Sequence, residues 1–190
     1  FWRHHVDQYE FFSFNFLKKL QLCQKKLKVC DVGVGTGFYS LLTLKHLSSS
    51  TVTAYDISTA SLSFSERLIC RHGYKNRFNG ELKNIITEKN WEKFDVVICN
   101  EVLEHLEDPS QFVGKLAELL CSSGKMFLTA AVNAANRDHI YLYEAIEDVR
   151  EQIHDKSLKI EASASFYAHN GSSGKGKTPE VVAFVLNKEN

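Results

Sequence analysis

The chain has 190 residues, of which 44% are hydrophobic and only two are proline. This length and composition predict one globular domain, residues 1–190, with a substantial core. Lysine plus arginine and aspartate plus glutamate each total 23, so no net charge attracts nucleic acid or an anionic membrane. No apolar run approaches the roughly 20 residues of a membrane span, and no secretory signal pattern opens the chain.

The cysteines are odd in number and show no Cys-x-x-Cys spacing: Cys23, Cys30, Cys70, Cys99 and Cys121. We interpret them as reduced core thiols rather than as disulfides or zinc ligands, which favours a cytoplasmic protein. Because the first residue is Phe1 and not methionine, we expect the chain to be part of a longer polypeptide.

Residues 1–22 are rich in aromatic side chains, and from Tyr9 onward their apolar spacing predicts a helix. Aromatic stripes of this kind usually pack into a core, so the helix is expected to lie on the sheet described next. A lid over an active site is the alternative interpretation.

The stretch 27–40, LKVCDVGVGTGFYS, predicts a buried strand, a tight turn and a helix that starts near Phe38. Three glycines, Gly33, Gly35 and Gly37, occupy the turn. This unit is typical of a nucleotide-binding α/β fold, because glycine lets a ligand lie against bare backbone at the carboxyl end of a strand.

Two aspartates indicate the kind of ligand. Asp56 ends a second apolar run, 52–55, where one carboxylate can accept hydrogen bonds from both hydroxyls of a ribose. Asp31 precedes the glycines, where it would repel a phosphate but suit an ammonium group. Since Phe38 replaces the third glycine of a dinucleotide fingerprint, an NAD-dependent oxidoreductase is the weaker alternative.

The later elements follow from periodicity and breakers. A helix is predicted over 60–71 with Ser58 or Thr59 as its cap, and then a strand near 77–79. The apolar run 94–100 suits a central parallel strand that is buried on both faces. The remaining predictions are a helix at 110–120 stopped by residues 122–124, a strand at 125–132, a helix at 144–154, antiparallel strands at 158–168 and 181–186, and a flexible connection at 170–178.

Three motifs occur in a fixed order: D-V-G-V-G-T-G at 31–37, Y-D-I-S at 55–58 and F-D-V-V-I-C-N-E-V-L-E-H-L at 94–106. The stretch 27–132 resembles the class I S-adenosylmethionine-dependent methyltransferases, especially the small-molecule branch with the ubiquinone-biosynthesis O-methyltransferases. The resemblance implies an α/β, Rossmann-like sheet of seven mostly parallel strands with a C-terminal antiparallel strand and helices on both faces. It also implies an N-terminal helix or lid (1–22), a cofactor-binding core (27–132) and a substrate-side segment with the closing strands (133–190).

The resemblance further implies methyl transfer from S-adenosylmethionine to an oxygen or nitrogen of a small molecule, with S-adenosylhomocysteine as product. The residues expected to bind the cofactor are Asp31, Gly33, Gly35, Gly37, Asp56, Ile57, Glu81, Leu82, Asn100 and Glu101. Asp31 and the glycine loop would hold the methionine end, and Asp56 the ribose. Glu81 and Leu82 would contact the adenine.

The reacting centre is expected beside Asn100 and Glu101, at the carboxyl end of strand 94–100. Glu101 and His139 are the predicted catalytic residues, with His139 accepting the proton of the acceptor; a structural, hydrogen-bonded role for His139 is the equal alternative. Tyr141 and Tyr143 are further candidates for contact with substrate. Under the lid interpretation, the residues that line the site would be Trp2, His5 and Tyr9.

The string E-x-x-E-H would place Glu101 and His105 on one face of a helical turn, with Glu104 beside them. Some relatives hold a divalent cation on such a triad together with a downstream histidine, here His139, whereas many relatives have the same string without a metal. We predict no metal ligands and keep Mg²⁺ as the alternative.

Two other functions remain open from the sequence. One is a metal-assisted RNA 2′-O-methyltransferase, and the other is a non-catalytic S-adenosylmethionine-binding domain. The partners we expect are a small-molecule acceptor and, if any protein, a second copy of the chain, so that the protein is a monomer or a homodimer. We expect neither a membrane nor a nucleic acid as partner.

Overall fold

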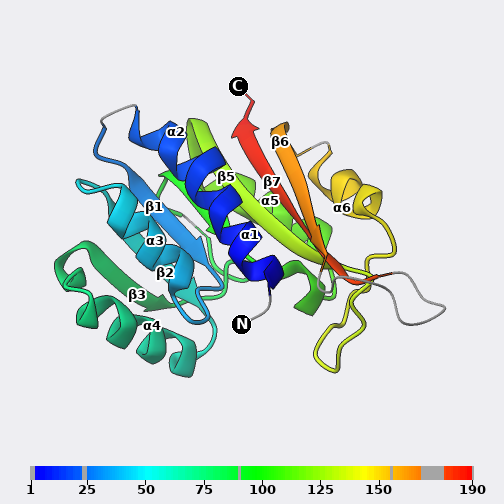
Figure 1. Ribbon diagram of the computed structural model, residues 1–190, viewed down its shortest axis with the longest axis horizontal. Coiled ribbons are helices and arrows are strands. Elements are labelled where there is room, and N and C mark those ends of the chain that lie inside the picture. Colours follow the sequence, from blue (N-terminus) through cyan, green and yellow to red (C-terminus); the bar gives the residue numbers. More distant parts are fainter. Residues whose placement is uncertain (1–2, 23–24, 90, 155, 168–177, 190) are drawn as a thin grey trace.

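The computed structural model describes residues 3–22, 25–89, 91–154, 156–167 and 178–189. Its centre is a seven-stranded sheet in the order β3-β2-β1-β4-β5-β7-β6 (Figure 1). The strands are β1 (Lys28–Val32), β2 (Thr51–Asp56), β3 (Phe78–Leu82), β4 (Phe94–Cys99), β5 (Leu120–Val132), β6 (Leu158–Tyr167) and β7 (Glu180–Lys188). The pairs among β1 to β5 are parallel, and β7 is antiparallel to both of its neighbours. The predicted fold class is therefore confirmed.

Helices cover both faces of the sheet (Figure 1). One face carries α1 (Arg3–Phe11), η1 (Phe12–Leu17), α2 (Lys18–Gln21), α3 (Phe38–His46) and α4 (Thr59–Arg71), and the other carries α5 (Pro109–Leu119) and α6 (Ile146–Ile153). Short 3-10 turns are η2 (Lys75–Arg77) and η3 (Leu103–His105). Parallel strands require such crossover helices, and the strands between the two layers become apolar throughout.

The N-terminal helix is confirmed, with one irregularity. It runs from Arg3 to Gln21 through η1, which is a π-helical segment. Phe12 and Phe16 are fully buried, and the Phe12 ring lies 4.7 Å from that of Phe127 in β5. This half of the helix therefore belongs to the core. Trp2, a candidate for lining the site, lies outside the described residues.

Several boundaries differ from the predicted ones. The third strand spans Phe78–Leu82 instead of 77–79, so Glu81 and Leu82 belong to it. The helix predicted at 144–154 begins at Ile146, because the Asp148 carboxylate accepts hydrogen bonds from the backbone N–H of Glu144 and Ala145. Residues 122–124 do not end a helix. They lie inside β5, where the register with β4 shifts.

Other sequence-based details concern caps, thiols and membrane spans. Ser58 rather than Thr59 caps α4, since its Oγ accepts from Ser61 N at 3.2 Å. The four described cysteines have free thiols, and Cys30 and Cys99 are buried. Cys23 and most of the connection 170–178 lie outside the described residues. Among the helices that the structure describes, none has the length and apolar character needed to cross a bilayer.

Candidate functional site

The glycine loop after β1 needs glycine at two positions for steric reasons. Gly33 and Gly37 have φ values of 72° and 79°, a left-handed conformation that disfavours side chains. A Cβ on Gly33 would lie 2.4 Å from Val102 Cγ2, and a Cβ on Gly37 would lie 2.6 Å from Ser65 Cβ. The loop thus packs directly against α4 and the segment after β4.

Asp56 at the end of β2 is tied to this loop. Its Oδ2 accepts from Gly35 N at 3.2 Å, and its Oδ1 accepts from Ser58 N at 2.8 Å. The residue is 9% exposed. Each carboxylate oxygen has two lone pairs, so both oxygens can accept a further hydrogen bond from a ligand.

A cavity of about 410 Å³ opens at the carboxyl ends of the strands, and we call it the carboxyl-edge cavity. Five of the predicted cofactor residues line it: Gly33, Gly35, Asp56, Ile57 and Glu101. Its remaining wall includes the segment 83–86 after β3, and also His105. The cavity lies where open α/β sheets bind their ligands.

The other predicted cofactor residues do not line this cavity. Asp31 is 2% exposed, and its Oδ2 accepts from Ser40 Oγ at 2.5 Å. Burial raises the pKa of Asp31 to about 6. Its carboxylate is therefore sealed beneath the glycine loop, where an ammonium group cannot reach it directly. Gly37 also lies outside the lining, at the start of α3.

Glu81 and Leu82 are not among the residues that line the cavity. The Glu81 carboxylate forms an ion pair with Lys83 Nζ at 2.7 Å and accepts from Asn79 Nδ2 at 2.7 Å, and Leu82 is exposed. The cavity wall on this side is instead made by residues 83–86. Sequence reasoning missed residues 83–86 because this segment contains no motif. The pair Ile85 and Ile86 within it was the only sign of an apolar wall.

Asn100 does not line the cavity either, but it connects three elements. Its Oδ1 accepts from Gln8 Nε2 in α1 at 2.8 Å and from Thr129 Oγ1 in β5 at 2.9 Å. Thr129 Oγ1 in turn accepts from Glu101 N at 2.9 Å. These bonds hold Glu101 in a left-handed conformation, with φ of 50°. Gln8 and Thr129 were not predicted, and no sequence motif marks them.

The predicted helical turn over E-x-x-E-H is wrong. Only residues Leu103–His105 are helical, in a 3-10 turn, so the i, i+4 spacing that would bring Glu101 beside His105 does not apply. One ligand atom from each of Glu104, His105 and His139 lies within 4.8 Å of the others, and Glu101 is not in this group. Glu104 is 1% exposed, and burial raises its pKa to about 7.

Both histidines have one ring nitrogen bound to a backbone carbonyl. His139 Nδ1 lies 2.5 Å from Ala134 O, and His105 Nδ1 lies 2.8 Å from Asp138 O. A carbonyl only accepts, so each Nδ1 is the donor of its bond, and in a neutral imidazole with this tautomer Nε2 is the acceptor. His139 therefore has a structural bond and also a nitrogen that can take up a proton.

The segment after β5 folds over Glu104. Ile140 N and Tyr141 N both donate to Glu104 O, at 2.8 and 3.0 Å. Tyr143 is fully buried and its hydroxyl donates to Gln152 at 2.6 Å. The Tyr143 side chain is therefore part of the core, and the predicted contact of Tyr143 with substrate is wrong. Tyr141 remains partly exposed.

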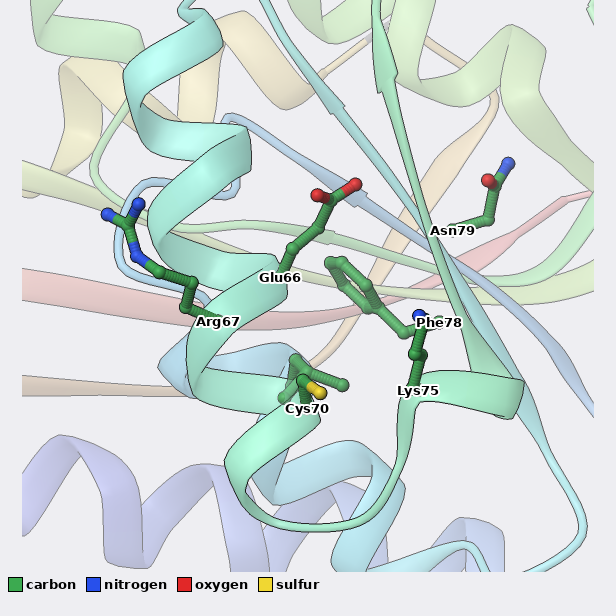
Figure 2. Close-up of a pocket in the computed structure, with 7 residues that line it drawn as sticks. Glu66, Arg67, Cys70, Lys75, Phe78 and Asn79 are labelled. Carbon is green, nitrogen blue, oxygen red and sulfur yellow. The ribbon is translucent and has the colours of Figure 1, made fainter.

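A second cavity of about 410 Å³ lies between the C-terminal half of α4 and the start of β3 (Figure 2). Glu66 and Cys70 from α4 face Phe78 across it, with Lys75 and Asn79 at its side (Figure 2). It lies toward the amino ends of the parallel strands and contains none of the predicted site residues. The carboxyl-edge cavity is therefore the candidate active site.

The sheet order and the glycine loop define the class I methyltransferase fold. Residues 30–126, about half of the chain, match the methyltransferase domain family. The chain belongs to this family, and the resemblance read from its motifs is confirmed.

Two individual relatives each share 28% sequence identity with the matched part of this chain. A ubiquinone biosynthesis O-methyltransferase from Coxiella burnetii is 28% identical over 129 residues, which are 68% of this chain and 53% of the relative. A malonyl-[acyl-carrier protein] O-methyltransferase from Halalkalibacterium halodurans is 28% identical over 102 residues, which are 53% of this chain and 38% of that protein. The chain thus spans about half or less of these relatives.

Solved structures agree on the fold. The magnesium protoporphyrin IX methyltransferase of Synechocystis PCC 6803, solved with bound S-adenosylhomocysteine, superimposes with a TM-score of 0.70 at 18% identity. The match covers 95% of this chain and 83% of that one. At this identity the likeness concerns the fold.

Proposed function

We propose that the chain binds S-adenosylmethionine in the carboxyl-edge cavity and transfers its methyl group to an oxygen or nitrogen of a small molecule. The observation that supports this most strongly is Asp56 beside the bare backbone of Gly33 and Gly35. Each of its two oxygens accepts one backbone hydrogen bond and keeps a second lone pair for a ribose diol, and the glycines leave room for the attached chain. Family membership and the O-methyltransferase relatives agree with this proposal.

A bound sulfonium supplies an activated methyl group, so the chain's own residues mainly orient the acceptor and remove its proton where needed. Glu101 lines the cavity, and His105, which also lines it, places its ring 5.1 Å from that of His139. We infer that Nε2 of His139 accepts the proton and that residues 133–145 border the acceptor. Residues 1–22 would cover the site and 27–132 would bind the cofactor.

The metal-assisted alternative receives little support from the donor set. Glu104, His105 and His139 offer one carboxylate and two imidazoles, whereas Mg²⁺ prefers an all-oxygen shell. We therefore propose methyl transfer without Mg²⁺ and no RNA substrate. Cytoplasmic placement and a monomeric or homodimeric state stay predictions.

Calorimetry with S-adenosylhomocysteine tests the proposal, with NAD as the comparison ligand and each titration repeated with Mg²⁺. We expect saturable binding of S-adenosylhomocysteine, no binding of NAD and no effect of Mg²⁺. Transfer of labelled methyl groups to phenols and amines would then separate an enzyme from a binding domain. A preference for NAD would overturn the assignment, and an affinity for RNA that falls steeply with salt would favour the RNA alternative.

A further inference from the structure

Strand β3 lies at one end of the sheet, and no strand among the described residues pairs with its outer side (Figure 1). Natural proteins often protect such an edge with proline, lysine or a β-bulge. The β3 sequence, Phe-Asn-Gly-Glu-Leu, contains no proline and no lysine, and its register with β2 has no shift. The outer side of β3 is therefore open to pairing with another extended segment.

The backbone groups that face this open side can be assigned. Lys83 N donates to Asp56 O at 3.0 Å, so the N–H of Lys83 points toward β2. Because the backbone groups of successive strand residues point to alternate sides, the N–H and C=O of Gly80 and Leu82 point away from β2. No described residue forms a hydrogen bond with these four groups. Phe78 adds one carbonyl, since its N–H already donates within the preceding turn η2.

A cavity accompanies the open side of β3. It is the second cavity described above, and Ile69, Cys70 and Phe78 form its apolar lining. A Cβ on Gly80 would lie 3.2 Å from Glu66 Oε1, so the Glu66 carboxylate lies beside the middle of the strand. Glu66 is exposed and forms no ion pair within the described part of the chain. The open side of β3 thus offers backbone groups, an apolar cavity and an unpaired negative charge.

The charges distinguish between two kinds of partner. Pairing of two copies of the chain through a twofold axis at Gly80 would bring both Glu66 carboxylates together, and like charges repel. A segment with a lysine or arginine opposite Gly80 would give Glu66 a partner instead. Arg67 points away from Phe78, whereas Lys75 lies at the Phe78 end of the cavity (Figure 2). An acidic residue near that end of the segment would match Lys75.

We propose that β3 binds an extended segment of another protein as an additional, antiparallel strand of the sheet. Its backbone would pair with the open groups of Phe78, Gly80 and Leu82, and its side chains would provide specificity. A basic residue of the segment lies opposite Gly80, beside Glu66. An apolar residue two positions later enters the cavity beside Cys70, and one two positions earlier covers Leu82, which is 57% exposed. This docking site does not depend on the proposed methyl transfer.

Fluorescence anisotropy with a labelled peptide, Ser-Thr-Val-Thr-Lys-Thr-Leu-Thr-Glu, tests the proposal. We expect saturable binding that saturating S-adenosylhomocysteine does not change. Exchange of the central lysine for glutamate should weaken binding about 10-fold, and Glu66→Lys should reverse this preference. Leu82→Pro should weaken binding at least 10-fold, because it removes an outward N–H at a position where an edge strand tolerates proline. Glu151→Lys is the matched control, because Glu151 is exposed on α6, on the opposite face of the sheet.

Alkylation by iodoacetamide, followed by mass spectrometry, locates the bound peptide. The peptide should protect Cys70 and leave the partly exposed Cys121 unchanged. Failure of the peptide to bind, competition with S-adenosylhomocysteine, or binding without protection of Cys70 would each overturn the proposal. A dimer in sedimentation that Leu82→Pro dissociates would assign the open side of β3 to a second copy and would also overturn it. Thermal unfolding verifies that each variant is folded, and none of these outcomes bears on methyl transfer.

Discussion

Asp56, the predicted ribose ligand, accepts two backbone hydrogen bonds, one from Gly35 in the glycine loop and one from Ser58 at the start of α4. Asp56→Ala should weaken binding of S-adenosylhomocysteine by about 1–3 kcal/mol, roughly 5- to 150-fold, because hydrogen bonds to a charged group are lost. Calorimetry measures this change. Asp95→Ala is the control, since Asp95 also accepts from a backbone N–H, that of Lys28, at the opposite edge of the sheet. Equal affinities of Asp56→Ala and wild type would refute the ribose placement.

A comparison of Gly37 with Gly73 separates the steric need for glycine from the conformational one. Both have φ near 80°, but a Cβ on Gly73 meets nothing within 4 Å, whereas one on Gly37 meets Ser65. Gly73→Ala should therefore cost only about 1–2 kcal/mol for the left-handed backbone. Gly37→Ala should cost a further 1–3 kcal/mol, roughly, for overpacking. Urea unfolding at pH 7 measures both, and similar costs would argue against the close contact with α4.

The sequence predicts some of these residues and not others for a physical reason. The glycines and Asp56 form a local pattern, because strand, turn and ligand contact follow one another along the chain. Gln8 meets Asn100 across 92 positions of sequence, and an amide has no preferred spacing that would announce such a contact. Asp31 has the expected position, but Ser40 in the first turn of α3 donates a hydrogen bond to its carboxylate.

In the N-terminal helix, neighbouring phenylalanines differ strongly in burial, so their contributions to stability should differ as well. Phe12 and Phe16 are buried in the core, whereas Phe14 between them is 62% exposed. We expect Phe12→Ala to destabilise the protein by about 3–5 kcal/mol, since a large buried ring is lost and a cavity remains. Phe14→Ala should change stability by less than about 0.5 kcal/mol. Chemical denaturation compares the two, and equal effects would mean that the helix does not pack as described.

The accuracy of the predicted elements follows their burial. The central strand β4 is buried at five of six positions, and its continuous apolar run predicted it correctly. The edge strand β3 has no fully buried residue, so its boundaries had no periodic signal. The turn after β4 was predicted as α-helical because its spacing fits one, whereas the left-handed Glu101 shortens it to a 3-10 turn.

The whole molecule should lose stability as pH rises from about 4 to 7. Burial raises the pKa of Asp31 to about 6 and that of Glu104 to about 7, from 3.8 and 4.5. The folded state then binds more protons than the unfolded state in this range, so each group contributes about 3 kcal/mol of stability below its unfolded pKa and loses it above its folded pKa.

Asp31→Asn and Glu104→Gln should remove this dependence one group at a time. Compared with wild type, each variant should gain stability more at pH 8 than at pH 4.5, as measured by urea unfolding. Asp108→Asn is a suitable reference, because Asp108 caps α5 at an exposed position. Parallel pH profiles of wild type and Glu104→Gln would show that Glu104 ionises normally.

The aromatic face of the N-terminal helix has a consequence for biosynthesis. Phe12 packs on Phe127 and Phe11 on Phe166, so each of these helix residues meets its neighbour only after more than a hundred further residues have been translated. Until then a growing polypeptide on the ribosome exposes this apolar surface to solvent, and the formation of such long-range contacts is slow. Nascent chains paused before β5 should consequently be the form most dependent on chaperones.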